Sequence, residues 1–299
     1  MFKSGIYIKA TVTTLAACIL MACGGENNHS NAEEKNTTSH TYKTATHSYT
    51  ILMPKNGAQV GKTVFDISIK DDTNTAVHSV TPSMTPTMTM GEAMGGHNHS
   101  TPATGCTETD IDGNSECTVY FLMASKMANG NEMGTWDLSF SLPEAEGVVN
   151  YSPEVLMNSN VKAQLKGGAN DQIPTMTNTE ARTYYIFNNG ITQTGETSSV
   201  ELFLATKESM MSFPTLIEGA ELNAGLTLDD IEVKVSTDNS NWIVATSAGQ
   251  GIWTAAEISA LPSTLFIALA VNGEIKTTDG EVAGTDNSST QISLTTSAM

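Results

Sequence analysis

Short runs in which apolar residues alternate with polar ones recur along most of this chain. Many of them are rich in β-branched and aromatic residues, and Gly, Asn, Asp and Pro separate one run from the next. A period of two residues is typical of a strand with one buried face, and the intervening residues are typical of turns. We therefore predict strands at Ser48–Met53, Val64–Ile69, Thr118–Met123, Thr135–Leu142, Thr183–Phe187, Val200–Ala205, Ile231–Ser236, Trp242–Thr246 and Leu265–Val271.

Helical periodicity is nearly absent from the sequence, and only one short helical turn is expected, near Thr254–Ala260. Regular short strands separated by turn residues favour an all-β chain of two immunoglobulin-like antiparallel β-sandwich domains. We place the first domain at residues 47–167 and the second at residues 170–296, with a linker that begins at Gly167-Gly168.

Residues 1–22 have the features of a lipoprotein signal peptide and are excluded from the fold prediction. Their apolar run is shorter than the roughly 20 residues of a membrane-spanning helix. It ends at Leu20-Met21-Ala22-Cys23-Gly24, which resembles a bacterial lipobox. That resemblance implies acylation of Cys23 and export, with a lipid anchor at the outer membrane facing the periplasm or at the cell surface. The alternatives are acylation at Cys18 and a secretory signal without lipid.

Residues 23–46 are rich in Asn, Ser, Thr, Glu and Lys and contain almost no large apolar side chain. Such a segment cannot bury enough surface to offset its chain entropy, so we predict a flexible tether. His29, His40 and His47 lie singly in or beside this segment, and we interpret them as solvated residues.

The chain is acidic, with 32 acidic residues, 14 basic residues and a formal net charge of −18. Because the sequence contains no basic cluster, the protein would repel a phosphate backbone, and we do not expect nucleic acid as a partner. Acidity would keep an exported protein soluble.

Two cysteines, Cys106 and Cys117, lie outside the leader region. Export places them in an oxidising compartment, where an even pair predicts a disulfide. Asp112-Gly113 between them is a signal for a hairpin turn. The alternatives are that both thiols join a copper site and that the acidic turn binds calcium.

The most distinctive chemistry lies between residues 84 and 99, in a turn-rich and almost uncharged segment. Thioether sulfur is a soft ligand that suits Cu(I), and imidazole suits copper, zinc and nickel. In an extended segment, side chains at even separations share one face, and Gly95-Gly96 would let the chain fold back. We predict a copper site with the candidate ligands Met84, Met88, Met90, Met94, His97 and His99.

Other interpretations of this segment stay open. The methionines would also serve as packing on a half-buried strand. A Cu(II) site would favour His97, His99 and Glu92, and a zinc or nickel site would use the two histidines with His78. A second group, Met123, Met127 and Met133, would pack in the core or face the first group.

Domain 1 resembles the YtkA-like family of small exported immunoglobulin-like modules. The similarity is carried by Val64–Ile69, by the Pro/Met/Gly/His stretch from Pro82 to His97, and by Tyr120–Met123 and Met133–Ser141. The family is associated with copper handling and cytochrome oxidase assembly. The resemblance therefore implies a β-sandwich that handles copper. From its place in an alternating run, we interpret Trp136 as the core tryptophan of this sandwich.

Signals of catalysis are missing from the sequence. There is no Gly-x-Ser-x-Gly elbow, phosphate-binding glycine loop or His-Glu-x-x-His motif, and Arg182 is the only arginine. All six histidines precede residue 100, so the second domain has none for acid–base chemistry. We predict a non-enzymatic, lipid-anchored copper protein that sequesters copper or delivers it to a partner, with domain 2 available to bind a protein. The alternative is a surface or periplasmic interaction lipoprotein without metal.

Overall fold

The computed structural model describes residues 38–143, 147–175, 178–259 and 263–294. The predicted signal peptide, Cys23, most of the tether and the end of domain 2 lie outside these residues. The described part of the chain is almost entirely β-structure, and two 3₁₀ turns are its only helical elements. No helix in these ranges is long and apolar enough to cross a membrane.

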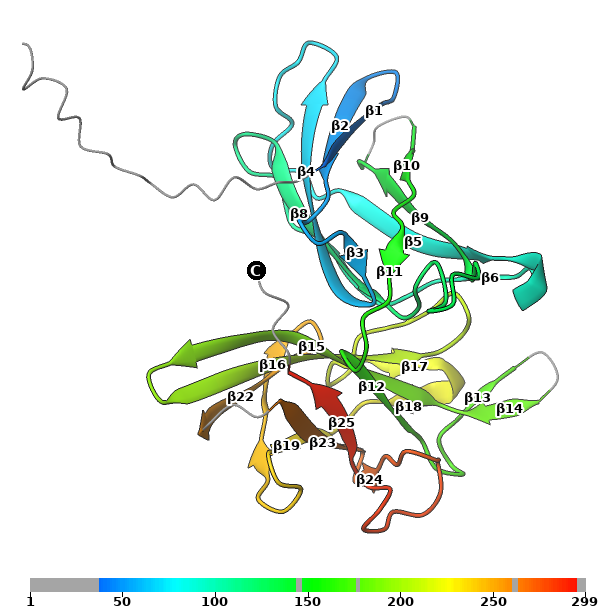
Figure 1. The fold of residues 1–299 in the computed structure, drawn as a ribbon, viewed down its shortest axis with the longest axis vertical. Helices are drawn as coiled ribbons and strands as arrows, with labels where there is room; N and C mark the ends of the chain where they lie inside the picture. The colour runs from blue at the N-terminus through cyan, green and yellow to red at the C-terminus, as the bar shows by residue number, and fades with distance from the viewer. Residues whose placement is uncertain (1–37, 144–146, 176–177, 260–262, 295–299) are drawn as a thin grey trace, which may run out of the picture. The chain divides into compact units, whose positions relative to one another are not determined.

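The first half of the described chain forms two antiparallel sheets and one small parallel pair (Figure 1). The five-stranded sheet contains, in spatial order, β1 (Ser39–Lys43), β2 (His47–Leu52), β4 (Gly61–Asp71), β8 (Asn114–Phe121) and β7 (Ala103–Cys106). The four-stranded sheet contains β10 (Val149–Tyr151), β9 (Gly134–Ser141), β5 (Ser83–Met90) and β6 (Asn98–His99). The parallel pair joins β3 (Ala58–Gln59) to β11 (Val155–Leu156), and the 3₁₀ turn η1 (Glu92–Met94) lies between β5 and β6.

Alternation along the strands creates the core between these two sheets. In β4, the apolar residues Phe65, Ile67 and Ile69 are buried, while the residues between them are only partly buried. In β9, Trp136 and every second residue after it as far as Phe140 are completely buried. The buried faces of both sheets belong to one hydrophobic cluster, which makes this half a β-sandwich.

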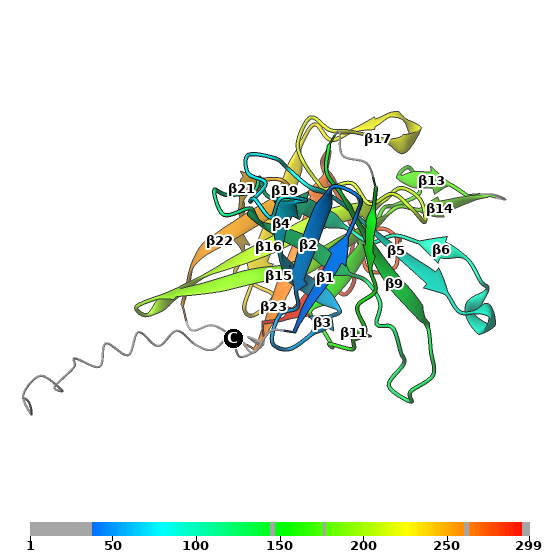
Figure 2. The same cartoon turned by 90° about the horizontal axis from the view of Figure 1, so that it is seen from above.

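The second half repeats this architecture with its own core. One sheet contains β12 (Lys162–Lys166), β15 (Thr183–Thr194), β16 (Thr197–Lys207), β22 (Ile252–Ser259) and β21 (Thr246–Gly249). The other contains β20 (Ile243–Val244), β19 (Ile231–Ser236), β23 (Thr264–Val271) and β24 (Glu274–Ile275), with β25 (Thr290–Ser293) also paired to β23. Two small hairpins are formed by β13 (Gln172–Pro174) with β14 (Thr179–Ala181), and by β17 (Glu221–Leu222) with β18 (Leu226–Thr227) around the 3₁₀ turn η2 (Asn223–Gly225). Figure 2 shows the same strands from above.

The predicted all-β sandwich fold is confirmed, and each of the nine predicted runs contains or overlaps a strand. The helical turn expected near Thr254–Ala260 is wrong, because residues 254–259 lie in strand β22, while Ala260 lies outside the described residues. A register shift opposite Val200 and the left-handed backbone of Glu257 mark a bulge there. The bulge changes the spacing of buried residues from two (Trp253, Ala255) to three (Ile258), which imitates a helical pattern.

Two boundaries differ from those expected. Residues 39–43 of the predicted tether form β1, which pairs with β2 along its whole length. Strand β12 pairs with β15 in the second sandwich, so the change from one set of sheets to the next comes before Lys162 rather than at Gly167-Gly168. Neither β1 nor β12 has a run of large apolar residues, which is why the hydrophobic pattern did not reveal them.

Candidate metal centre

Strand β5 carries three of the six predicted ligands on one face. The side chains of Met84, Met88 and Met90 are buried and contribute to the core of the first sandwich, while Thr85 and Thr89 on the other face are exposed. Met94 in η1 is half-buried against the same core. His99 in β6 is buried, whereas His97 just before β6 is exposed. The loop therefore folds back on β5, as the glycine pair predicts.

Pairing across three neighbouring strands places His99, Met88 and Trp136 in one row. Met88 lies directly opposite His99 on β6 and directly opposite Trp136 on β9, and both pairings are antiparallel. Directly opposed residues in antiparallel strands point to the same face, with Cβ atoms about 4.5–5.5 Å apart. The imidazole and the indole also form a perpendicular ring contact, with centroids 5.4 Å apart. The row combines one imidazole, one thioether and one indole, all inside the sandwich.

The tautomer of His99 follows from its single hydrogen bond. Its Nδ1 lies 2.9 Å from the backbone oxygen of Ser100. A carbonyl oxygen only accepts, so Nδ1 carries the proton and donates, and Nε2 of the neutral ring carries a lone pair. Burial lowers the pKa of His99 below its ordinary value, an effect that the Ser100 hydrogen bond opposes, so the ring is neutral at physiological pH.

The Nε2 atom of His99 is buried and has no hydrogen-bond partner among the described residues. Such an unpaired buried acceptor is costly and demands an explanation. Histidines that bind metals through one nitrogen usually donate the other N–H to a carbonyl or carboxylate, which fixes the tautomer. His99 has this arrangement, so its chemistry fits a metal ligand.

Gly134 makes room for the thioether of Met88. It lies opposite Met90 in the β5–β9 pairing, and a Cβ atom built on it would lie 3.0 Å from Cε of Met88. The same strand end contacts the loop through Met133, whose backbone oxygen accepts a hydrogen bond of 3.0 Å from Gly91. Met133 is half-buried against the core, close in sequence and pairing to Met90. Met133-Gly134-Thr-Trp136 contributes to the family resemblance, but its spacing in the sequence gives no sign that Gly134 makes room for Met88.

The six predicted ligands do not all meet at one point. Met84 precedes Met88 by four residues, or about 13 Å along a strand, and lies opposite Phe140. His97 and Glu92 are exposed, and His78 is exposed in the loop before β5. In the described ranges no three residues of the types His, Cys, Asp and Glu come together as a metal-binding group. The structure pairs Met88 with His99 and with Trp136, and Met90 lies two residues further along the same buried face of β5.

Cys106 and Cys117 form the predicted disulfide between β7 and β8, where they are directly opposed and have Cα atoms 3.9 Å apart. Their sulfur atoms are bonded to each other, so they are not free thiol ligands. The turn between them is closed by Asp110, whose carboxylate accepts hydrogen bonds from the backbone of Asp112 and Asn114. These bonds lower the pKa of the Asp110 carboxyl.

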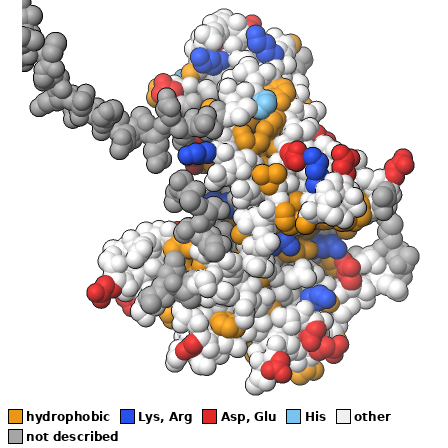
Figure 3. All heavy atoms as spheres, viewed as in Figure 1, with side chains coloured by type: hydrophobic (Ala, Val, Ile, Leu, Met, Phe, Trp, Pro, Cys, Tyr) orange, Lys and Arg blue, Asp and Glu red, His pale blue; other side chains and the backbone are white. Residues whose placement is uncertain are grey.

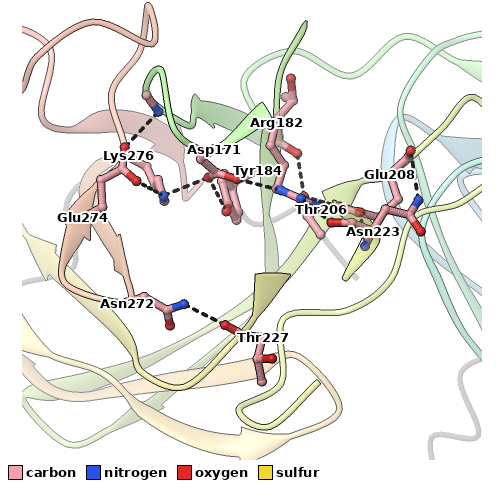
Figure 4. Close-up of polar contacts among 12 residues, drawn as sticks. Asp171, Arg182, Tyr184, Thr206, Glu208, Asn223, Thr227, Asn272, Glu274 and Lys276 are labelled. Carbon is pink, nitrogen blue, oxygen red and sulfur yellow. Dashed lines mark hydrogen bonds and ion pairs between the residues drawn. The ribbon is translucent and has the colours of Figure 1, made fainter. Parts of the chain in front are cut away.

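The second sandwich contains a buried cluster of charged side chains that the sequence did not reveal (Figure 4). Asp171 accepts hydrogen bonds from Arg182, Tyr184 and Lys276, with lengths of 2.7, 2.6 and 2.8 Å. Arg182 also pairs with Glu208, which in turn accepts a hydrogen bond of 2.8 Å from the backbone of Asn223. Burial acts to raise the pKa of Asp171, but the bonds from Lys276 and Tyr184 outweigh it and lower the pKa.

This charged cluster differs from the His99 site because its side chains supply one another with hydrogen-bond and ion-pair partners. The guanidinium of Arg182 donates to Asp171, to Glu208 and to the backbone oxygen of Asn223. Lys276 donates to Glu274 as well as to Asp171, and it lies 5.3 Å from the centre of the Tyr184 ring. Buried charges that are fully paired are retained as structural elements. We interpret the cluster as part of the framework of the second sandwich.

Comparison with known proteins leaves the family open. No protein-family model matches the sequence, and no curated protein matches it. Among solved structures, a conserved domain protein from Bacillus anthracis is similar at 10% identity and a TM-score of 0.32, with 88% of this chain and 93% of that chain covered. The Yersinia pseudotuberculosis adhesin InvE is similar at 14% identity and a TM-score of 0.23, with 79% and 55% covered. The Escherichia coli adhesin FdeC is similar at 15% identity and a TM-score of 0.22, with 79% and 60% covered. The chain thus spans between 55% and 60% of the length of these adhesin structures.

Proposed function

We propose that this protein is an exported, lipid-anchored copper-binding protein. The observation that carries the proposal is the buried Nε2 of His99, which has a lone pair, no partner among the described residues, and Met88 directly opposite. A lone pair fixed by a hydrogen bond on the other ring nitrogen is the arrangement of a metal ligand. A neighbouring thioether is a soft ligand that favours Cu(I) over hard metal ions.

The proposed ligands are His99 Nε2 and the sulfur of Met88, with Met90 two residues further along the same buried face. Met94 and His97 lie in the connection between β5 and β6, where they would contact an ion on its way to the buried row. Met84 would serve as packing in this arrangement. Because the proposed ligands are buried, bound copper would be shielded from a substrate, so the proposed role is sequestration or delivery rather than catalysis.

A Cu(I) titration against a competing chromophoric chelator tests this proposal. We expect one equivalent of Cu(I) to bind tightly, and His99→Leu and Met88→Leu to weaken binding by at least tenfold each. Met84→Leu and His78→Leu are matched controls, because they remove the same chemical groups away from the row and should leave the affinity unchanged. Equal affinities in all five proteins, or no binding, would refute the proposal.

The second candidate is an interaction lipoprotein without metal, and a surface feature of the second half favours it. Large apolar side chains are exposed there; among them are Met210, Met211, Ile217, Val244 and Val282. On the face drawn in Figure 3, apolar side chains occur as separate patches among polar ones. If this candidate is right, Met211→Lys with Val244→Lys would abolish capture of a protein partner, and copper would have no effect.

A further inference from the structure

The ligand atoms of the proposed copper site are all electrically neutral. His99 donates its Nδ1 proton to the Ser100 carbonyl and offers the Nε2 lone pair of a neutral imidazole, and thioethers and indole carry no charge. Of the acidic residues near the row in sequence, Glu92 is exposed in η1, and Asp137, which follows Trp136, lies on the opposite face of β9 from the indole. No group of three or more His, Cys, Asp and Glu side chains forms within the ranges that the structure describes. Nothing found there would cancel the second charge of a divalent ion.

Because the site is buried, the charge of the ion determines how much free energy its transfer from water costs. His99, Met88 and Trp136 are almost inaccessible to solvent, at 5%, 0% and 0% relative exposure. The cost of moving an ion from water into such a region rises with the square of its charge, so a divalent ion needs more ligands, or anionic ones, to offset it. Zinc and Cu(II) sites accordingly use several histidines, carboxylates or thiolates. A buried group of neutral, soft ligands therefore suits a monovalent ion.

Trp136 completes this set from the third strand of the row. Its plane is perpendicular to that of His99, with an angle of 89° between the rings. An ion on the Nε2 lone pair lies in the imidazole plane, so perpendicular rings allow it to face the indole. The indole itself is held in place by its hydrogen bond of 3.0 Å from Nε1 to the backbone oxygen of Met123. An indole face attracts a cation most strongly when both are shielded from water.

We propose that the site takes a monovalent soft cation, Cu(I) or its redox-inert analogue Ag(I), and that Trp136 contacts the bound ion through its ring face. This inference rests on the proposed copper site. It adds the charge of the bound ion, and it adds Trp136 as a residue that determines specificity. In the row, His99 donates nitrogen, Met88 donates sulfur, and Trp136 excludes water and anions from the remaining side.

Titration of the purified protein with Ag(I), followed by tryptophan fluorescence, tests the proposal. We expect quenching that saturates at one equivalent in the wild type and in Trp242→Phe, and no quenching in Trp136→Phe. Affinity for Ag(I) should fall in the order Trp, Phe, Leu at position 136, by about tenfold from Trp to Leu. A hundredfold excess of Zn²⁺ should not displace Ag(I).

The indole N–H resonances of the wild type supply a readout that needs no substitution in the core. Addition of Ag(I) should shift the Trp136 signal and leave those of Trp242 and Trp253 in place. Tight Ag(I) binding without a response from Trp136, or displacement of Ag(I) by Zn²⁺, would overturn this inference. The proposal that the protein binds a metal would remain in either case. Failure to bind Ag(I) and Cu(I) at all would instead refute the proposed function.

Discussion

At the scale of single residues, the protonation and orientation of His99 are the main findings. The sequence placed His97 and His99 two residues apart and assigned them one shared face. The structure separates them, because the pairing of β6 with β5 turns His99 into the sandwich while His97 is left exposed. The sequence predicted a site in this segment from its residue types, but the unpaired Nε2 inside the sandwich follows from the pairing of β6 with β5, which no local pattern revealed.

The buried histidine also predicts how the metal-free protein responds to acid. The folded-state pKa of His99 is lower than the ordinary 6.5, so the unfolded chain binds a proton more readily than the folded one. Stability therefore decreases as the pH falls through the unfolded value and continues to decrease until the folded pKa is reached. Wild-type protein should lose more stability than His99→Leu between about pH 7.5 and about pH 5.5. Urea unfolding at both pH values measures this difference.

The control for this acid response is His78→Leu, because His78 is exposed. Its loss of stability over the same pH range should equal that of the wild type. If His99→Leu also matched the wild type, the ring would titrate equally in both states, and its burial as a neutral group would be contradicted.

At the scale of elements, strand β5 serves as both core and candidate site. Its alternation of threonine and methionine is compatible with a half-buried strand, and in the structure its methionines do face the core. At Met88 and Met90, a core-facing side chain can both pack and bind a metal. The sequence alone could not distinguish these two methionines from Met84, whose proposed role is packing only. Strands with strong alternation could be predicted because one face of each is buried in the core. In contrast, β1, β12 and the bulged β22 are recognised only from their pairing with other strands.

The close approach of β5 to β9 predicts that Gly134→Ala is harmful. The added methyl group would lie 3.0 Å from both Cε of Met88 and Cα of Met90, and it would meet the Thr89 carbonyl oxygen. Overpacking of this kind typically costs about 1–3 kcal/mol, and here it would also displace Met88 from the row. Both the urea midpoint and the affinity for Cu(I) should decrease.

Gly190→Ala is the matched control for this substitution. Gly190 lies in β15, and the nearest neighbouring atom to an added Cβ is Oε2 of Glu201 at 3.8 Å. Its affinity for Cu(I) should be that of the wild type. An unchanged Cu(I) affinity in Gly134→Ala would show that the position of Met88 does not matter for copper.

At the scale of the whole molecule, two sandwiches with separate cores lie in one chain, and the candidate chemistry is confined to the first. A small third cluster unites residues of both halves, including Tyr120 and Phe203, whose rings stack with centroids 3.8 Å apart. The sequence predicted the two sandwiches from strand spacing. It did not predict the charged cluster of the second, because Asp171, Arg182 and Lys276 are widely separated and lie at strand ends.

That charged cluster predicts an unequal response to the loss of two lysines. Lys276 is buried and paired with Asp171, so Lys276→Met would leave a buried carboxylate without one of its partners. Removal of one member of a buried ion pair typically costs about 3–5 kcal/mol. Lys126→Met removes an exposed pair with Glu154 and should cost less than about 1 kcal/mol. Urea unfolding measures both values, and equal losses would contradict the structural role of the cluster.

In the proposed site, copper is held by His99 and a thioether inside the first sandwich. X-ray absorption spectroscopy of the protein loaded with one equivalent of Cu(I) tests it most directly, because it identifies the bound atoms. We expect a shell that contains both imidazole nitrogen and sulfur, with the imidazole signal lost in His99→Leu and the sulfur signal weakened in Met88→Leu. A shell of nitrogen and oxygen alone, unchanged in both variants, would contradict it.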